Sequence, residues 1–233
     1  MDNNNIIVTN SNEAKLDSPP QIEKNGEKII SLTDFFPKIK VYSVYFKQGI
    51  PGALPDCYLR KGIAKRLQQA ASLLPVDLHL VVLDGWRSYE VQLSLYKETE
   101  KNIAEKNPAI SQEELSLQVQ RFVALPSQDI NKPANHLTGG TVDLTIANKD
   151  GWLDMGTDFD EFIDQAGTHW FAKNSQGTDK DEEIIKNRTL LLECMEKADF
   201  NNDPEEWWHY NYGNPVWASD TGKKACYKGV LNL

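Results

Sequence analysis

Two residues that could bind a metal ion, His136 and Asp143, lie seven positions apart in the segment ANHLTGGTVDLTIAN, in a chain with four histidines. In the alternating run TVDLTI, Asp143 falls on the polar face of the expected strand. An odd offset would direct His136 to the other face of a straight strand. The pair Gly139–Gly140 permits backbone angles closed to other residues, so the chain can turn and return His136 to the polar face. The alternative is a surface histidine followed by an aspartate on a solvated strand.

A second pair, Glu206 and His209, lies in the segment PEEWWHY and is separated by two tryptophans. Histidine is a frequent zinc ligand, and a nearby carboxylate can take a proton from water bound to the metal. A straight strand would direct these two side chains to opposite faces, so the pairing requires a bend in the chain. The alternative is an aromatic core patch in which His209 only finds a hydrogen-bond partner.

A third candidate is Arg87, which follows the apolar run LVVLDGW at the expected end of a strand. Its guanidinium is always charged, and it could hold a carboxylate or a developing oxyanion. Taken alone, Arg87 is more simply explained as a surface arginine. Together, two imidazoles, two carboxylates and a guanidinium provide the groups of a hydrolytic zinc site. The helical H-E-x-x-H motif of many zinc proteases is absent.

The elements expected to position these residues follow from the periodicity of apolar side chains. Strands are expected at residues 40–46, 76–84 and 141–146, and strand-like composition returns at 205–212. Helices are expected at about 59–74, 89–105 and 181–198, and a further one begins at Ser111, where Glu114 completes a capping box. The blocks do not alternate regularly, which predicts an α+β fold of one domain. We expect a small, mainly antiparallel sheet that carries the zinc site and is flanked by helices.

Composition limits the function classes. Residues 1–27 are polar and predict a flexible N-terminal arm, and residues 28–233 are expected to form the domain. The net charge of −9 argues against a nucleic-acid partner. We expect no membrane partner, because no run approaches the roughly 20 apolar residues of a membrane span. The absence of a signal-like N-terminus predicts a cytoplasmic location. The three cysteines lack C-x-x-C spacing and are expected to be buried thiols.

The chain resembles the zinc D-alanyl-D-alanine dipeptidases of the vancomycin-resistance type, within the D-Ala-D-Ala metallopeptidases. The resemblance runs from about residue 42 to residue 210 and has its parts in family order: DGWRSYEVQ, HLTGGTVDLT, DMGTDFDEF and EWWHY. The family pattern S-x-H-x-x-G-x-A-x-D matches His136, Gly139 and Asp143, and the pattern E-x-W-H matches Glu206 and His209.

This resemblance implies hydrolysis of the dipeptide D-alanyl-D-alanine by one Zn²⁺ ion per chain. His136, Asp143 and His209 would be the zinc ligands, and Glu206 the general base and acid. Arg87 would stabilise the tetrahedral intermediate, and Asp160 would bind the ammonium group of the substrate. The expected partner is therefore a small dipeptide, and the resemblance implies nothing about the oligomeric state.

The sequence departs from the family pattern at Ala134, where the family has serine, and at Thr141, where it has alanine or serine. In addition, RSYE replaces the usual Arg-Pro. Loss of the serine hydroxyl is expected to weaken substrate binding by roughly 0.5–1.5 kcal/mol, so these departures bear on substrate preference. Two alternatives stay open: a related zinc carboxypeptidase or endopeptidase acting on peptidoglycan stem peptides, and a zinc-binding module without catalysis. The long segment 97–133, which could cover the site, favours the dipeptide.

Overall fold

A five-stranded sheet is the centre of the fold in the computed structural model, which describes residues 26–33 and 36–233. The order of its strands is β2 (Ile39–Val41), β4 (His79–Asp84), β5 (Thr141–Ala147), β7 (His209–Asn211) and β6 (Asn201–Asn202). Only β2 and β4 pair in parallel. A second, two-stranded sheet pairs β1 (Ile29–Ser31) with β3 (Tyr58–Arg60). The expected α+β fold with a mainly antiparallel sheet is therefore confirmed.

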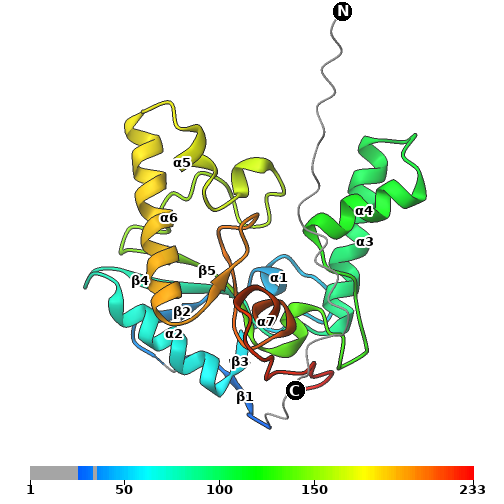
Figure 1. The fold of residues 1–233 in the computed structure, drawn as a ribbon, viewed down its shortest axis with the longest axis horizontal. Helices are drawn as coiled ribbons and strands as arrows, with labels where there is room; N and C mark the ends of the chain where they lie inside the picture. Colours follow the sequence, from blue (N-terminus) through cyan, green and yellow to red (C-terminus); the bar gives the residue numbers. More distant parts are fainter. Residues whose placement is uncertain (1–25, 34–35) are drawn as a thin grey trace, which may run out of the picture.

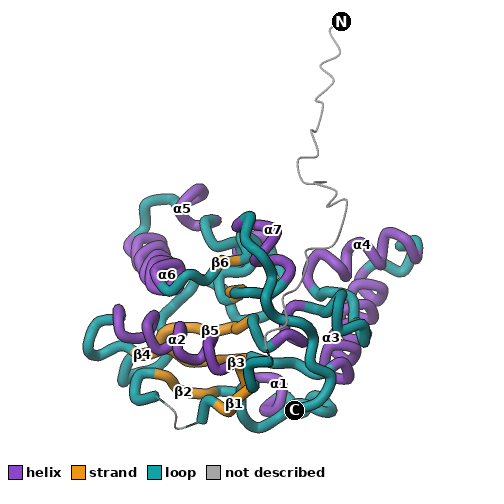
Figure 2. Tube along the Cα trace, turned by 60° about the horizontal axis from the view of Figure 1, so that its bottom comes forward, coloured by secondary structure: helices purple, strands orange, loops and turns teal. Residues whose placement is uncertain are grey.

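Two helices, α2 (Lys61–Leu73) and α6 (Asp179–Lys197), cover one face of the sheet (Figures 1 and 2). This face carries the alternate apolar side chains of the two central strands, which belong to the main hydrophobic core together with the inward residues of both helices. Apolar residues at three- and four-residue spacing give α2 its buried stripe. Val142, Leu144 and Ile146 all belong to this core, which confirms the face that the alternation in β5 predicts.

The opposite face carries the candidate site. Near one end of β4 and β5 it packs against α1 (Val44–Lys47) through a small apolar cluster. Beyond this cluster lie two long helices, α3 (Tyr89–Lys106) and α4 (Gln112–Phe122), which form a hairpin on the other side of the molecule from α2 and α6 (Figure 1). The remaining helices are α5 (Trp170–Asn174), α7 (Pro215–Thr221) and two 3₁₀ turns, η1 (Asn135–Thr138) and η2 (Asp164–Ala166).

The strand expected at residues 40–46 is wrong in its second half. Strand β2 ends at Val41 and the chain enters the short helix α1. Because β2 is an edge strand, it has a hydrogen-bonding neighbour on one side only, and its β-propensity yields to packing. Helix α1 buries Val44 and Tyr45 against the sheet. The short helix thereby places the Tyr45 hydroxyl at the candidate site.

Other boundaries shift by a few residues. The helix expected from residue 59 begins at Lys61, because Leu59 pairs with Ile30 in the two-stranded sheet. The expected strand at 205–212 is formed only at His209–Asn211, and the residues before it make a turn. The predicted N-cap of α4 is confirmed, since the hydroxyl of Ser111 accepts a hydrogen bond from the amide of Glu114.

Residues 1–25 of the expected N-terminal arm lie outside the described residues. At its end, Glu27 contacts the domain, where its carbonyl accepts from Arg60 and its carboxylate accepts from the hydroxyl of Tyr227. Cys57 and Cys194 are buried free thiols, whereas Cys226 is half-buried, so the expected burial holds for the first two. No helix in the described part of the chain is long and apolar enough to cross a membrane.

Candidate metal and catalytic site

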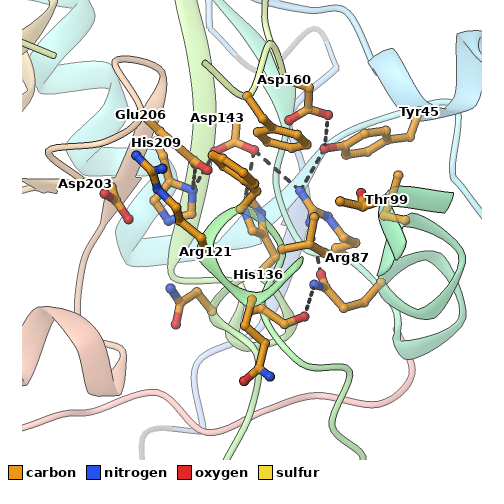
Figure 3. Close-up of a pocket in the computed structure, with 18 residues that line it drawn as sticks. Tyr45, Arg87, Thr99, Arg121, His136, Asp143, Asp160, Asp203, Glu206 and His209 are labelled. Atoms are coloured by element: carbon orange, nitrogen blue, oxygen red, sulfur yellow. Dashed lines mark hydrogen bonds and ion pairs between the residues drawn. The ribbon is translucent and has the colours of Figure 1, made fainter. Parts of the chain in front are cut away.

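Three potential metal ligands meet at the end of the central strands (Figure 3). His136 comes from η1, Asp143 from β5 and His209 from β7, and one ligand atom from each lies within 4.8 Å of the others. The Asp143 carboxylate is 3.3 Å from Nε2 of His136 and 3.0 Å from Nδ1 of His209. The structure thus brings together the three residues expected to bind metal.

The glycine pair before β5 gives His136 its position. Gly139 has φ +67°, a left-handed angle that favours glycine, and it ends the turn η1. A Cβ atom on Gly140 would lie 2.5 Å from the carbonyl oxygen of Tyr212, so the chain passes where only glycine fits. The turn returns the imidazole of His136 to the face of Asp143, as the sequence predicts.

The tautomer of His136 follows from its second nitrogen. Nδ1 lies 2.7 Å from the carbonyl oxygen of Gly85. Because a carbonyl only accepts, Nδ1 donates, so Nε2, which faces Asp143, is the ring nitrogen that could bind a metal ion. Metal-binding histidines commonly donate their other ring nitrogen to such an acceptor.

Asp143 and His209 are register partners across the antiparallel pair of β5 and β7. Burial alone would raise the pKa of the Asp143 carboxyl, but His136 and His209 hold it well below its usual range. Burial lowers the pKa of His209, whereas Asp143 raises it, and the result is about 9. Asp143 is only 2% exposed. The polar face of β5, on which the sequence places Asp143, is therefore buried and not solvated. Its burial strongly favours a cationic partner for the carboxylate.

The donor set fits zinc. Two imidazole nitrogens and one carboxylate oxygen are the ligand types of catalytic zinc sites, which leave a fourth position open. Oδ1 of Asp143 is buried and lies 3.0 Å from Nδ1 of His209, and among the described residues it accepts no hydrogen bond of good geometry. A buried carboxylate oxygen without a well-aligned donor is costly unless a cation satisfies it.

Glu206 lies on the turn before β7, where the amide of His209 donates to the Glu206 carbonyl. This turn supplies the bend that the Glu206–His209 spacing requires, and it brings Oε2 of Glu206 to 3.5 Å from Nδ1 of His209. Burial raises the pKa of the Glu206 carboxyl to about 8. Trp207 and Trp208, which follow Glu206 in the turn, are buried in the main core and so anchor the turn to it.

Arg87 is held on several sides. A register shift in β4 between Val82 and Asp84 re-aims the end of that strand. Nε of Arg87 donates to Asp84 at 2.8 Å and Nη2 donates to the hydroxyl of Tyr45 at 3.1 Å. Nη2 also lies 3.5 Å from Oδ2 of Asp143. Although burial lowers the pKa of the guanidinium, the surrounding acids raise it above its usual value, so the group stays charged.

Asp160 lies on the same cavity and accepts a hydrogen bond of 2.7 Å from the Tyr45 hydroxyl (Figure 3). Its backbone has φ +60°, an unusual conformation for a residue with a side chain, and such strain is often found at functional sites. Burial raises the pKa of its carboxyl to about 7. The structure therefore places all six expected site residues around one cavity.

The cavity has a volume of about 220 Å³ and is covered by the α3–α4 hairpin. Leu95, Phe122, Val123 and Phe162 give it an apolar side. Arg121 crosses to the other wall, with ion pairs of 3.1 Å to Asp164 and 3.2 Å to Glu205. The rings of Phe122 and Phe162 stack with centroids 5.0 Å apart. The expectation that segment 97–133 covers the site agrees with this arrangement.

Of the two departures from the family pattern, Thr141 has a packing role. Its hydroxyl donates to Asn211 at 2.9 Å and accepts from Asn214 at 2.9 Å in a buried network. Neither Ala134 nor Thr141 lines the cavity, whereas Asn135 does. The expected influence of Thr141 on substrate preference therefore has no contact to act through.

Sequence reasoning missed four residues of the site, namely Tyr45, Asp84, Gln92 and Arg121. The sequence predicts a strand at Tyr45, where the strand in fact ends earlier, and it indicates Asp84 only as the last residue of the strand expected at 76–84. Gln92 and Arg121 lie on helices whose apolar periodicity carries no information about polar contacts. A carboxylate three residues before Arg87 was the one signal that could have suggested an ion pair.

A family model and a known relative both match most of the chain. A family model described as D-Ala-D-Ala dipeptidase matches residues 47–223. A D-alanyl-D-alanine dipeptidase of Synechocystis sp. is 30% identical over 176 residues, which cover 69% of this chain and 71% of that protein. Among solved structures, a mutant of the vancomycin-resistance D,D-pentapeptidase VanY in complex with Zn(II) aligns at a TM-score of 0.42 with 16% identity. That alignment covers 73% of this chain and 83% of the VanY chain.

Proposed function

The chain belongs to the D-Ala-D-Ala dipeptidase family of metallopeptidases, and we propose that it hydrolyses the dipeptide D-alanyl-D-alanine to free D-alanine with one zinc ion per chain. The observation that carries the proposal is the convergence of His136, Asp143 and His209 beside Glu206. A site that only stored metal would have no need of a buried carboxylate next to its ligands.

In this proposal the zinc ligands are Nε2 of His136, the Asp143 carboxylate and Nδ1 of His209, the atoms that already face one another. When bound, zinc supplies a Lewis acid that polarises the scissile carbonyl and lowers the pKa of water to about 7. The hydrogen bond from His136 to Gly85 holds that imidazole in the tautomer needed for ligation.

Glu206 acts as general base and then as general acid. Its carboxylate takes a proton from the attacking water and delivers it to the leaving amine nitrogen, so one group serves both steps. Glu206 must be ionised for the first step. Burial opposes ionisation and raises the pKa of Glu206 to about 8. The positive charge of the proposed zinc ion would favour the ionised form, as a nearby opposite charge generally does.

Arg87 stabilises the negative charge that develops on the carbonyl oxygen. Its guanidinium is already oriented by Asp84 and Tyr45, so it need not reorganise during the reaction. Asp160 binds the ammonium group of the substrate from the same cavity. A zwitterionic dipeptide, which has a positive and a negative end, then faces a cavity that contains both the positive charge of Arg87 and the negative charge of Asp160.

The size of the cavity supports a dipeptide over a longer peptidoglycan stem. Its volume of about 220 Å³ is below the roughly 300–1,000 Å³ of pockets that take drug-sized ligands. The Arg121 ion pairs tie the end of α4 that lines the cavity to Asp164 and Glu205. A longer peptide would have to displace this contact.

The proposal is tested by supplying the zinc-loaded protein with D-Ala-D-Ala, L-Ala-L-Ala and a muropeptide that ends in D-Ala-D-Ala, and by measuring free alanine. We expect D-Ala-D-Ala to be hydrolysed with the highest kcat/KM. A higher kcat/KM for the muropeptide would instead assign the protein to stem-peptide trimming. A preference for L-Ala-L-Ala would contradict the stereochemistry.

A further inference from the structure

Gln92, in the first turns of α3, is a buried polar residue whose side-chain amide joins two parts of the site. It is 4% exposed. Its Oε1 accepts a hydrogen bond of 3.0 Å from Nη1 of Arg87, and its Nε2 donates one of 2.7 Å to the carbonyl of Ala124. Because a guanidinium only donates and a carbonyl only accepts, the amide can satisfy both partners in one orientation only.

The contact matters for Arg87 because each of its other nitrogens has a different partner. Nε is paired with Asp84. Nη2 is shared between Tyr45 and Asp143 (Figure 3). Among residues 26–33 and 36–233, Gln92 alone accepts a hydrogen bond from Nη1. Without this acceptor, one arm of the guanidinium would be buried with its hydrogen-bonding capacity unmet.

Ala124, the second partner, follows α4 and lines the cavity together with Phe122 and Val123. Its carbonyl orients the amide of Gln92, so that Oε1 faces Arg87. The α3–α4 hairpin, which covers the cavity, therefore also holds Oε1 of Gln92 in place as the acceptor for Arg87.

We propose that Gln92 is a positioning residue that holds Arg87 in the orientation needed to stabilise the oxyanion. This inference rests on the proposed function, because the role of Arg87 does. The geometry required of an oxyanion donor is strict, and a displacement of about 1 Å can cost about 100-fold in rate. Gln92 acts through Arg87 and makes no contact with the reacting atoms in this proposal.

Two substitutions separate positioning from packing. Gln92→Met keeps the length of the side chain and removes both hydrogen bonds, whereas Gln92→Glu keeps an acceptor for Arg87 and loses the donor to Ala124. Gln118→Met, at an exposed glutamine of α4, is the matched control. We expect Gln92→Met to lower kcat on D-Ala-D-Ala by about 10- to 100-fold with a smaller change in KM, as for an interaction made in the transition state. We expect Gln92→Glu to recover most of kcat and the control to match the wild type.

A binding measurement and a double-mutant cycle complete the test. We expect Gln92→Met to weaken binding of a phosphinate analogue of the tetrahedral intermediate by the same factor as kcat, while binding of D-alanine changes little. In an Arg87→Ala background, Gln92→Met is expected to have no further effect on analogue binding, because its partner is gone. Equal losses of analogue affinity in both backgrounds would overturn the inference.

The outcomes also separate this inference from the proposed function. A zinc-loaded wild type that does not hydrolyse D-Ala-D-Ala would contradict the proposed function. An active wild type whose Arg87→Ala variant is impaired, but whose Gln92→Met variant keeps full kcat and analogue affinity, would overturn the role of Gln92 alone. Thermal unfolding of each variant shows whether the fold is retained.

Discussion

The imidazole of His209 and the carboxylate of Asp143 face each other across two antiparallel strands, with 3.0 Å between Nδ1 and Oδ1. They are register partners in β5 and β7, so the backbone hydrogen bonds of the sheet set their separation. The third proposed ligand, His136, is brought to the pair by a turn whose glycines permit a close backbone approach. Two rigid strands and one turn thus set the positions of the three proposed ligands.

Removal of the metal is expected to abolish activity and to lower Tm. A ligand that binds only the folded state stabilises it, by about 4 kcal/mol at a free concentration 1,000 times Kd. Calorimetric scans after chelation and after zinc is restored measure this. Asp143→Asn is expected to bind less than one zinc per chain and to show no rise in Tm. A chelated protein that remains fully active would exclude a metal mechanism.

The KM for D-Ala-D-Ala is expected to fall as pH rises through about 7. Burial raises the pKa of the Asp160 carboxyl to about 7, so the group is protonated below that pH and cannot pair with an ammonium. The α-amino group of the substrate stays charged up to about pH 8. Asp160→Asn should raise KM at pH 8 and remove this dependence. A variant with the pH profile of the wild type would assign the ammonium to another residue.

Arg121→Ala is expected to widen the substrate range. The substitution removes the ion pairs that join α4 to Asp164 and Glu205, and each exposed pair contributes only about 0–1 kcal/mol to stability. The fold should therefore persist, while hydrolysis of N-acetyl-D-Ala-D-Ala rises relative to D-Ala-D-Ala. Lys101→Ala removes an exposed ion pair within α3 and is the control. An unchanged substrate ratio would show that Arg121 does not restrict the cavity.

Thr141→Val is expected to lower the free energy of unfolding by about 1–3 kcal/mol, because it removes a hydroxyl from the buried network with Asn211 and Asn214. Substrate preference should stay as in the wild type. Thr145→Val, on the same face of β5, is the control, since the buried hydroxyl of Thr145 has no hydrogen-bond partner among the described residues. Urea unfolding measures both variants. A change of substrate preference in Thr141→Val would give that residue a role in the cavity.

The sequence predicts the cluster of His136, Asp143 and His209 because its signals are local. Alternation in β5 assigns Asp143 to one face, and the glycine pair explains how His136 joins it. The bend required between Glu206 and His209 is present as a turn. Such signals depend on a few neighbouring residues, so they survive without knowledge of the tertiary structure.

Features that depend on contacts between distant segments are harder to predict from the sequence. The burial of Asp143 could not be inferred, because the hairpin and the loop that carries Asp160 cover its face from elsewhere in the chain. The sequence predicts that Tyr45 lies in a strand. The edge strand β2 instead ends before it, and the short helix α1 directs Tyr45 to Arg87. The contact of Gln92 with Arg87 and Ala124 joins three elements, and no periodicity in the sequence indicates it.

In the proposed reaction, Glu206 transfers the proton during a zinc-dependent hydrolysis of D-Ala-D-Ala. The most direct test compares the wild type with Glu206→Gln for zinc content and for D-alanine released in the same preparation. We predict one zinc per chain in both proteins and a kcat lower by about 100- to 10,000-fold in the variant. A Glu206→Gln variant that binds zinc and keeps the full rate would contradict the account.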